Sequence, residues 1–266
     1  MAELLRTERV SRSFGGLQAV RDVSIQVEAG SFHAIIGPNG AGKTTFFNIV
    51  SGALKPTAGR VFFKGRDITG TPLHRMAHLG IGRAYQITSL FPALTVAENV
   101  RLAAQARGSD NFKFWRHSDK LQGYRERAAA TIGLVGLGGR EELLASALPH
   151  GDKRKLELAL LLAGEPELLL LDEPTAGMAA NQVPELIEII KGLRESGRHT
   201  IMLVEHRMDV VMSVSDRITV MHNGAVLAED TPRAIAADPR VQQAYLGELY
   251  DDVLAGSEEE AHGAAA

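Results

Sequence analysis

The chain has 266 residues, a formal net charge of −3 from 29 basic and 32 acidic side chains, and no cysteine. This composition excludes a disulfide-stapled scaffold and a thiolate metal site, and it gives no electrostatic argument for binding nucleic acid. Apolar residues make up 45% of the chain and charged residues 23%, which is enough apolar side chain for a large buried core.

No segment carries a signal for crossing a membrane. Residues 1–6 lack the basic start and the apolar stretch of a signal peptide. The most apolar segment, 156–171, is interrupted by the Gly-Glu-Pro-Glu sequence at 164–167 and is therefore too short to span a bilayer. We expect any role at a membrane to depend on partner proteins.

The beginning of the chain predicts a small antiparallel sheet followed by a buried strand. Apolar and polar residues alternate over 5–10 and again over 23–27, with a turn at 28–31. Residues 32–36, an apolar and β-branched run, predict a buried strand, and 44–50 predict a helix.

Between this strand and helix lies the sequence Gly-Pro-Asn-Gly-Ala-Gly-Lys-Thr at 37–44, which matches the phosphate-binding loop G-x-x-x-x-G-K-[ST]. Glycines let successive backbone N–H groups point into one concavity, and the start of the helix adds partial positive charge. Lys43 supplies a full positive charge, and Thr44 supplies a hydroxyl for Mg²⁺. We therefore predict that the chain binds a nucleoside triphosphate through Asn39, Gly40, Ala41, Gly42, Lys43, Thr44 and Thr45.

Phe14 stands on a predicted loop, where an apolar side chain has little structural reason to be. One interpretation is a face on which adenine stacks, with Val20 as its apolar neighbour. The alternative is a residue of a small satellite cluster of the core.

The middle of the chain predicts a strand followed by a turn within 59–65, a further strand at 81–85 that leads to Gln86, and then a mainly helical region. A capping box from Thr95 to Glu98 starts the first of its helices. The loop at 108–117 contains Trp115, which we interpret as local packing. The helices are expected at 95–106, 118–134 and 152–163.

Strands and helices alternate again in the last part of the chain. Strands are predicted at 168–171 and 200–204, separated by a helical pattern over 183–193. Asn223-Gly224 between two apolar runs predicts a type I′ hairpin. Short helices are expected from Thr231 and over 238–249, and the Glu-, Ala- and Gly-rich end predicts disorder.

Two acidic residues, Asp172 and Glu173, directly follow the four leucines at 168–171. In open α/β sheets, ligand groups gather at the carboxyl ends of the strands. A carboxylate at the end of a buried strand is costly unless a positive charge meets it, so Asp172 is predicted to hold Mg²⁺. Glu173, one residue on, is predicted to take a proton from water. The alternative is a capped strand end with acids on the surface.

His206 follows the predicted strand at 200–204 and is interpreted as a contact of the γ-phosphate, although the chain has nine histidines and most must be ordinary. Gln86 is interpreted as orienting the attacking water or joining the Mg²⁺ shell.

Together, residues 37–44, Gln86, residues 168–177 and His206 resemble the ATPase subunit of an ATP-binding-cassette (ABC) transporter over roughly 4–250. The resemblance implies an α/β fold, in which a P-loop NTPase core carries an antiparallel β subdomain and an α-helical subdomain inserted at about 88–163. It implies one domain over 1–250, with 251–266 as a disordered tail.

The resemblance also implies that two ATPase subunits meet head to tail and enclose ATP, so that a signature motif of the facing subunit completes each site. Gly151 represents this motif here. The implied catalytic residues are Lys43, Gln86, Glu173 and His206, and the implied ligands of Mg²⁺ are Thr44, Gln86 and Asp172.

The signature itself departs from the family. Residues 148–152 are Leu-Pro-His-Gly-Asp, where the family commonly has Leu-Ser-Gly-Gly-Gln. Pro149 removes the serine hydroxyl but is tolerable at a helix start, and Gly151 keeps close backbone approach. Asp152 adds negative charge near a phosphate, so two interpretations remain: a working variant, or a weakened composite site in an asymmetric pair. Residues 178–181 also differ from the usual Leu-Asp pair, which leaves the cross-dimer contact there open.

Residues 13–20, 38–48, 108–125, 204–211 and 244–248 resemble the branched-chain amino acid uptake subgroup, which also contains importers of urea, short amides and aromatic acids. This implies an ATP- and Mg²⁺-dependent ATPase that powers import of such a small polar solute. The implied partners are a second ATPase subunit, identical or paralogous, the transmembrane permeases and a solute-binding protein, with no nucleic acid. The implied location is the cytoplasmic face of the cell membrane, held there by the permeases. The alternatives are a non-transport ABC ATPase, a small-molecule kinase, or a catalytically weak regulatory subunit.

Overall fold

The computed structural model describes residues 2–84, 90–106 and 118–245. Gln86, the predicted loop at 108–117 with Trp115, and the predicted disordered tail at 251–266 lie outside the described residues.

The first sheet is antiparallel, as predicted, and has the strand order β2-β1-β5-β6, with β3 paired to β1. The predicted run at 23–27 is divided between two strands, because Ser24 and Ile25 form a break between β2 and β3. The strands are β1 (Glu3–Phe14), β2 (Leu17–Val23), β3 (Gln26–Glu28), β5 (Ala58–Phe63) and β6 (Arg66–Asp67).

The second sheet has the order β11-β10-β4-β9-β8-β7, and all its neighbours are parallel except the hairpin β10–β11. Every residue of β4, β8 and β9 is buried, which explains their continuous apolar sequences. Positive φ angles of 48° at Asn223 and 78° at Gly224 confirm the predicted type I′ turn. The strands are β4 (Phe32–Ile36), β7 (Ile81–Arg83), β8 (Leu168–Asp172), β9 (Thr200–Val204), β10 (Arg217–His222) and β11 (Ala225–Asp230).

Helix α1 (Lys43–Val50) joins the two sheets, since Phe46 and Phe47 lie in one core cluster with residues of both. Helices α2 (Leu73–Leu79) and α7 (Met208–Val214) were not predicted, because seven residues span too few turns for a 3.6-residue period to stand out. Two predicted helical segments are confirmed as α6 (Val183–Glu195) and α8 (Pro232–Ala237). Part of the helix predicted at 238–249 is present, over 239–245.

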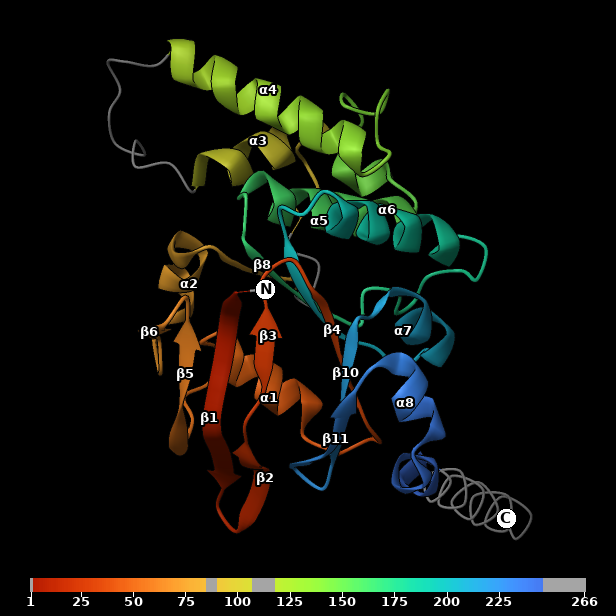
Figure 1. The fold of residues 1–266 in the computed structure, drawn as a ribbon. Coiled ribbons are helices and arrows are strands. Elements are labelled where there is room, and N and C mark those ends of the chain that lie inside the picture. The colour runs from red at the N-terminus through yellow and green to blue at the C-terminus, as the bar shows by residue number, and fades with distance from the viewer. Residues whose placement is uncertain (1, 85–89, 107–117, 246–266) are drawn as a thin grey trace, which may run out of the picture.

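Three helices between β7 and β8 form a separate group beyond the ends of the sheets (Figure 1). They are α3 (Val96–Ala106), α4 (Ser118–Leu134) and α5 (His150–Ala163), with the short 3-10 turn η1 (Ala145–Ala147) before α5. The capping box at the start of α3 is only half formed. Thr95 Oγ1 accepts from Glu98 N at 3.2 Å, but the Glu98 carboxylate binds Arg101 instead. The predicted fold class is confirmed, whereas the domain boundaries stay predictions.

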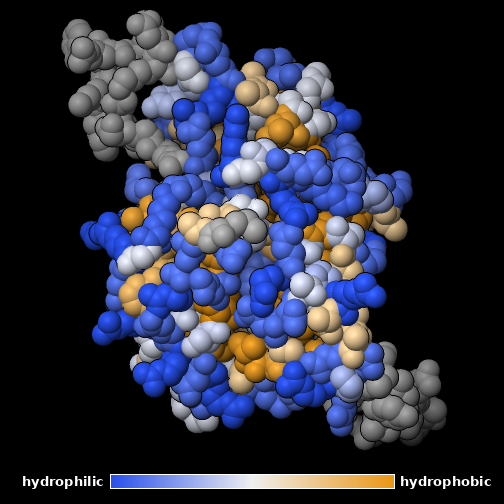
Figure 2. All heavy atoms as spheres, viewed as in Figure 1, coloured by the Kyte–Doolittle hydropathy of each residue, from blue (hydrophilic) through white to orange (hydrophobic). Residues whose placement is uncertain are grey.

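Hydrophilic residues cover most of the face seen in Figure 2, and hydrophobic residues gather there in separate patches. Among the described residues, no helix combines the length and apolar character needed to cross a membrane.

Candidate nucleotide site

The predicted phosphate loop runs from the end of β4 to the start of α1, as the motif requires. Gly42 begins the helix in the left-handed conformation, with φ at 95°. A Cβ added there would lie 2.3 Å from the backbone oxygen of Ala19 on β2. Only glycine fits this position, both because of its backbone angle and because β2 approaches so closely.

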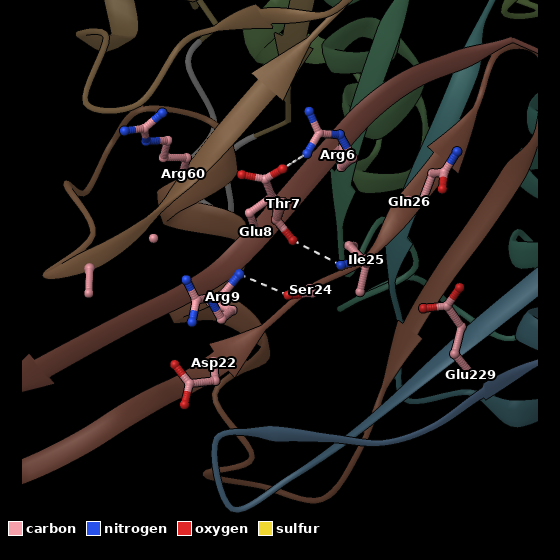
Figure 3. A pocket seen from close by; sticks show the side chains of 12 residues that line it. Arg6, Thr7, Glu8, Arg9, Asp22, Ser24, Ile25, Gln26, Arg60 and Glu229 are labelled. Atoms are coloured by element: carbon pink, nitrogen blue, oxygen red, sulfur yellow. Dashed lines mark hydrogen bonds and ion pairs between the residues drawn. The ribbon is translucent and has the colours of Figure 1, made fainter.

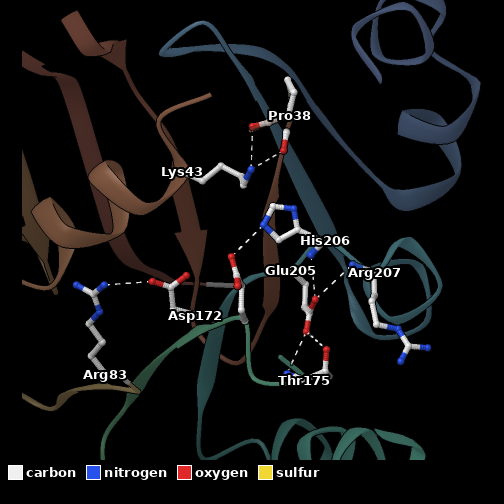
Figure 4. Close-up of polar contacts among 10 residues, drawn as sticks. Pro38, Lys43, Arg83, Asp172, Thr175, Glu205, His206 and Arg207 are labelled. Carbon is white, nitrogen blue, oxygen red and sulfur yellow. Dashed lines mark hydrogen bonds and ion pairs between the residues drawn. The ribbon is translucent and has the colours of Figure 1, made fainter. Parts of the chain in front are cut away.

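Lys43 is held inside the loop. Its Nζ donates to the carbonyl oxygens of Gly37, at 2.5 Å, and Pro38, at 2.9 Å, and the residue is 6% exposed (Figure 4). Asn39, Gly40 and Thr44 are exposed beside it. The open side of the loop is therefore formed by exposed backbone and a hydroxyl, with the ammonium group beneath them.

Asp172 ends β8 and is almost fully buried. Its Oδ2 accepts from Arg83 Nη2 at 3.2 Å, and the side chains are 2% and 8% exposed respectively. Its Oδ1 is buried without a hydrogen-bond partner in the described part of the chain. Burial raises the pKa of the Asp172 carboxyl, and the Arg83 charge opposes that rise. Arg83 Nη1 also donates to Asn48 Oδ1, at 2.6 Å, and Ser51 Oγ, at 2.7 Å, so that it ties α1 to β8.

The donor set around Asp172 fits Mg²⁺. Buried polar atoms are rarely left without a partner, so the Asp172 Oδ1 atom is suited to bind a cation or a water. Mg²⁺ is usually held by one or two carboxylates together with phosphate oxygens, and seldom by an all-protein cage. Consistent with this, the described residues contain no group of three or more acidic or imidazole side chains that could hold a metal. Thr44 and Asp172 would hold the ion, and Gln86 lies outside the described residues.

Glu173 and His206 lie in direct contact. Glu173 Oε1 is 2.9 Å from His206 Nε2, and these side chains are 26% and 46% exposed. Because an ionised carboxylate can only accept, the Nε2 atom of the imidazole carries the shared proton. Glu173 has a φ of 49°, a left-handed conformation that is rare for a side chain of this size and is often found at functional sites. The structure thus brings together the predicted base and the predicted phosphate contact.

Phe14 and Val20 have different surroundings. The prediction that Phe14 lies on a loop is wrong, because it is the last residue of β1 and pairs with Leu17 of β2. It is 46% exposed, with the Arg12 guanidinium 4.7 Å from the ring centroid. Val20 has no exposed surface and packs in the core cluster around α1. Val20 is one of the two fully buried residues of β2, so the structure places it in the core and not on an exposed face beside Phe14.

The predicted signature stands at the start of α5. Pro149 is the N-cap residue and His150 opens the helix, both exposed, as expected for proline at a helix start. Gly151 is buried, and a Cβ there would lie 2.7 Å from Gln182 Oε1. Asp152 pairs with Arg140 and, at 3.4 Å, with Lys155. Its negative charge is therefore balanced within the chain, which weakens the charge argument for an impaired site.

Two cavities lie away from the phosphate loop. The larger, about 970 Å³, opens on the antiparallel sheet among acidic and basic side chains that include Arg9, Arg60 and Asp22 (Figure 3). No helix start lines it, and its arginines lie among the carboxylates of Glu8, Asp22 and Glu229, so it offers no cradle of backbone N–H groups like that of the phosphate loop. The second is a groove of about 410 Å³ between α2 and β7 on one side and α3 and α5 on the other. We call it the interlobe groove, because it separates α2 and β7 from the group of helices α3–α5.

The sequence of this chain matches the models of two protein families. The model "ABC transporter" matches residues 20–176, and the model "Branched-chain amino acid ATP-binding cassette transporter" matches residues 225–251. The chain belongs to the ABC transporter family.

Named relatives extend the similarity beyond the matched segments. The chain is 39% identical over 252 residues to the high-affinity branched-chain amino acid transport ATP-binding protein LivG of Salmonella typhimurium, covering 92% of this chain and 98% of that protein. Among solved structures, the ADP conformation of an ATP-binding cassette of an ABC transporter superposes with a TM-score of 0.82 at 31% identity, covering 93% of this chain and 100% of the other. A dimeric post-hydrolysis cassette bound to ADP and Pi has a TM-score of 0.72 at 25% identity, covering 86% and 99%. This ABC ATPase therefore binds ATP and couples its hydrolysis to transport.

Sequence reasoning missed two residues of the site, Arg83 and Glu205. Arg83 precedes the predicted Gln86 by three positions and gives no local signal, because its carboxylate partner lies 89 positions away. Glu205 follows an apolar strand just as Asp172 does, a pattern that could have marked it.

Proposed function

We propose that this chain is the ATP-hydrolysing subunit of an importer for branched-chain amino acids or a related small polar solute. The main evidence for the class of transported solute is the match of residues 225–251 to the branched-chain amino acid cassette model. It is supported by the relative named as a branched-chain amino acid transport ATP-binding protein.

The proposed chemistry follows from the side chains at the strand ends. Lys43 and the loop amides bind the phosphates of ATP, and Thr44 and Asp172 hold Mg²⁺. The bound ion would supply charge neutralisation at the phosphates. Glu173 orients a water and accepts its proton, and His206 holds Glu173 through Nε2 at 2.9 Å. Phe14 offers its ring to the adenine. Proton transfer thus falls to Glu173, and charge stabilisation to Lys43 and His206.

The exposed start of α5 supports a head-to-tail dimer. Pro149 and His150 face away from the core of their own chain. Backbone N–H groups at a helix start bind anions, so this end of α5 is suited to reach a phosphate held by a second subunit. The dimeric cassette among the similar structures supports the same arrangement. The partner subunit is either a second copy of this chain or a paralogue.

The interlobe groove is the proposed contact with the permeases. Apolar side chains of α2 and α5, among them Leu73, Met76 and Leu161, line much of it, together with His74 and His78. Such a groove suits an amphipathic helix of another protein. We place the chain at the cytoplasmic face of the membrane, bound there by the permeases, with a solute-binding protein in the same complex.

The decisive test is transport by the whole complex. The chain, its partner ATPase, the permeases and the solute-binding protein are reconstituted in vesicles, and uptake of labelled leucine and of urea is measured with ATP inside. We expect ATP-dependent uptake of leucine. ATP hydrolysis without uptake of any small polar solute would favour a non-transport ABC ATPase.

Glu173→Gln tests the assigned base. The amide keeps the size of the side chain but cannot take a proton, so we expect kcat to fall by about 10²–10⁴-fold while ATP binding is retained. Steady-state hydrolysis and nucleotide binding are measured with Glu195→Gln, a change at an exposed residue at the end of α6, as control. Hydrolysis by Glu173→Gln near the parent rate would contradict this role.

A further inference from the structure

Glu205 is a buried carboxylate that lies between the loops after β8 and β9. It is 3% exposed. Its Oε1 accepts from Thr175 N at 3.2 Å and from the Thr175 hydroxyl. Its Oε2 accepts from the backbone N–H groups of His206, at 2.9 Å, and Arg207, at 3.3 Å. Figure 4 shows the Glu205 side chain between Thr175 and these N–H groups.

Each oxygen of this carboxylate accepts hydrogen bonds from a different loop. Thr175 lies two residues after Glu173, on the segment that leaves β8, whereas His206 and Arg207 follow β9. A buried carboxylate is costly unless it is neutralised or fully hydrogen-bonded. In the described chain no basic side chain forms an ion pair with Glu205; both of its oxygens accept hydrogen bonds from donors of these two loops, and the Arg207 charge interacts with the carboxylate from further away. The carboxylate therefore joins the loop carrying Glu173 to the loop carrying His206.

We propose that Glu205 is a positioning residue that sets the contact between Glu173 and His206. The proposal rests on the proposed function in one respect, namely that these two side chains act on ATP. A carboxylate is required because it offers acceptors on both sides. Glutamine would turn its NH₂ group toward one set of donors, and aspartate is one methylene too short to reach both loops.

The backbone of Glu173 supports the same conclusion. A non-glycine residue with φ at 49° persists only where its surroundings hold it in place. The Glu173 N–H donates to Val204 O at 2.9 Å, and its carbonyl accepts from Ala176 N at 3.0 Å. Glu205 adds two further bonds at Thr175, between these anchors. The strained residue is thus held on one side by Val204, the last residue of β9, and on the other by its own loop, which Glu205 binds at Thr175.

A double-mutant cycle tests the proposal. Glu205→Gln, His206→Ala and the double variant are compared by steady-state hydrolysis and by nucleotide binding. We expect Glu205→Gln alone to lower kcat by about 10- to 100-fold without changing nucleotide affinity, since misplacing a catalytic group by about 1 Å has an effect of this size. In the His206→Ala background the same change should lower kcat by a smaller factor, because the contact with His206 is already lost and only the support of the Glu173 loop remains to be removed.

Glu229→Gln is the matched control. Glu229 is a partly buried glutamate that also accepts from a threonine hydroxyl, Thr219, but it lies on β11 away from the site. The Glu229→Gln variant should leave kcat unchanged. A parental kcat in Glu205→Gln, or an equal fall with and without His206, would overturn the proposal. If Glu205→Gln does not fold, Thr175→Ala replaces it in the same cycle, because it removes a donor from the other side.

A second readout does not depend on hydrolysis. The ring nitrogen resonances of His206, assigned by their loss in His206→Ala, are recorded by NMR without nucleotide. Glu205→Gln should shift the Nε2 resonance, because the bond to Glu173 is disturbed, and Glu229→Gln should not. An unshifted resonance would overturn the proposal even if the parent hydrolyses ATP. A shifted resonance in a chain without ATPase activity would support the positioning role and count against the proposed function alone.

Discussion

At the scale of single residues, the site is governed by how each buried charge is satisfied. Asp172 uses one oxygen for Arg83 and keeps the other free, and Asp152 is neutralised by Arg140 and Lys155. The two acids therefore have different capacities: Asp172 can take a cation, whereas Asp152 has little charge left to repel a phosphate. This difference favours the working variant of the signature over the weakened one.

Arg83→Met is expected to weaken the binding of Mn²⁺, used as a probe for Mg²⁺, by about 10–100-fold, because it removes the hydrogen bond that orients Asp172. Stability should fall by about 3 kcal/mol, since a buried carboxylate loses its partner. Mn²⁺ binding is measured by electron paramagnetic resonance in the presence of ADP, and stability by urea unfolding. Arg101→Met serves as control, because its partner Glu98 lies on α3, away from the site. Parental Mn²⁺ affinity in Arg83→Met would show that Arg83 does not orient the ligand.

At the scale of elements, the starts of α1 and α5 are both built around a glycine, but for different reasons. Gly42 is confined by backbone, 2.3 Å from Ala19 O for an added Cβ, whereas Gly151 is covered only by the flexible end of Gln182. The first turns of α5 are also tied to the segment after Glu173, since Arg154 Nη2 donates to Ala176 O at 3.3 Å. The signature helix and that segment therefore belong to one packed unit.

Gly42→Ala is expected to lower the free energy of unfolding by about 2–4 kcal/mol, because it adds strain at positive φ to a clash with backbone. Gly40→Ala should lower it by only about 1 kcal/mol. Gly40 also has a positive φ, at 75°, but an added Cβ there meets nothing within 4 Å. Urea unfolding of both variants gives the comparison. Equal losses would mean that the approach of β2 to the loop does not constrain Gly42.

At the scale of the whole molecule, a chain of polar side chains links three neighbouring strands at one edge of the larger sheet. His33 on β4 contacts Thr219 Oγ1 on β10 at 2.7 Å, and that hydroxyl donates to Glu229 on β11 at 3.3 Å. Burial, with a smaller contribution from the Arg217 charge, lowers the pKa of His33 to about 4. The folded protein therefore keeps this ring neutral where the unfolded chain would already bind a proton.

Stability should consequently fall on acidification. The contribution of neutral His33 is complete above about pH 6.5 and is lost as the pH falls toward about 4, by up to about 3 kcal/mol. Burial raises the pKa of Glu229 and of Asp172, so these carboxyls act in the opposite direction. Urea unfolding of the parent and of His33→Gln at pH 7.5 and 4.5 separates the effects. The variant should lose about 2–3 kcal/mol less than the parent between these values; parallel losses would exclude His33 as the cause.

Local sequence was enough to predict most of the elements and to mark the candidate residues of the site. The run before Gly37, the turn at Asn223-Gly224 and the acids after four leucines are encoded in consecutive residues, because periodicity, turn chemistry and strand ends are local properties. For this reason Lys43, Asp172, Glu173 and His206 could be assigned before the fold was known. Gln86 was assigned in the same way and lies outside the described residues.

Only the tertiary structure decided which of these groups are paired, buried or free. Arg83 and Asp172 are 89 positions apart, and Thr175 and Glu205 are 30 apart, so no local pattern connects them. Val20 looked available beside Phe14, but the packing of β2 against α1 buries it. The physical reason is common to all three cases. Burial and the satisfaction of a charge depend on what the fold brings alongside a residue, and this is set by long-range packing that neighbouring residues do not encode.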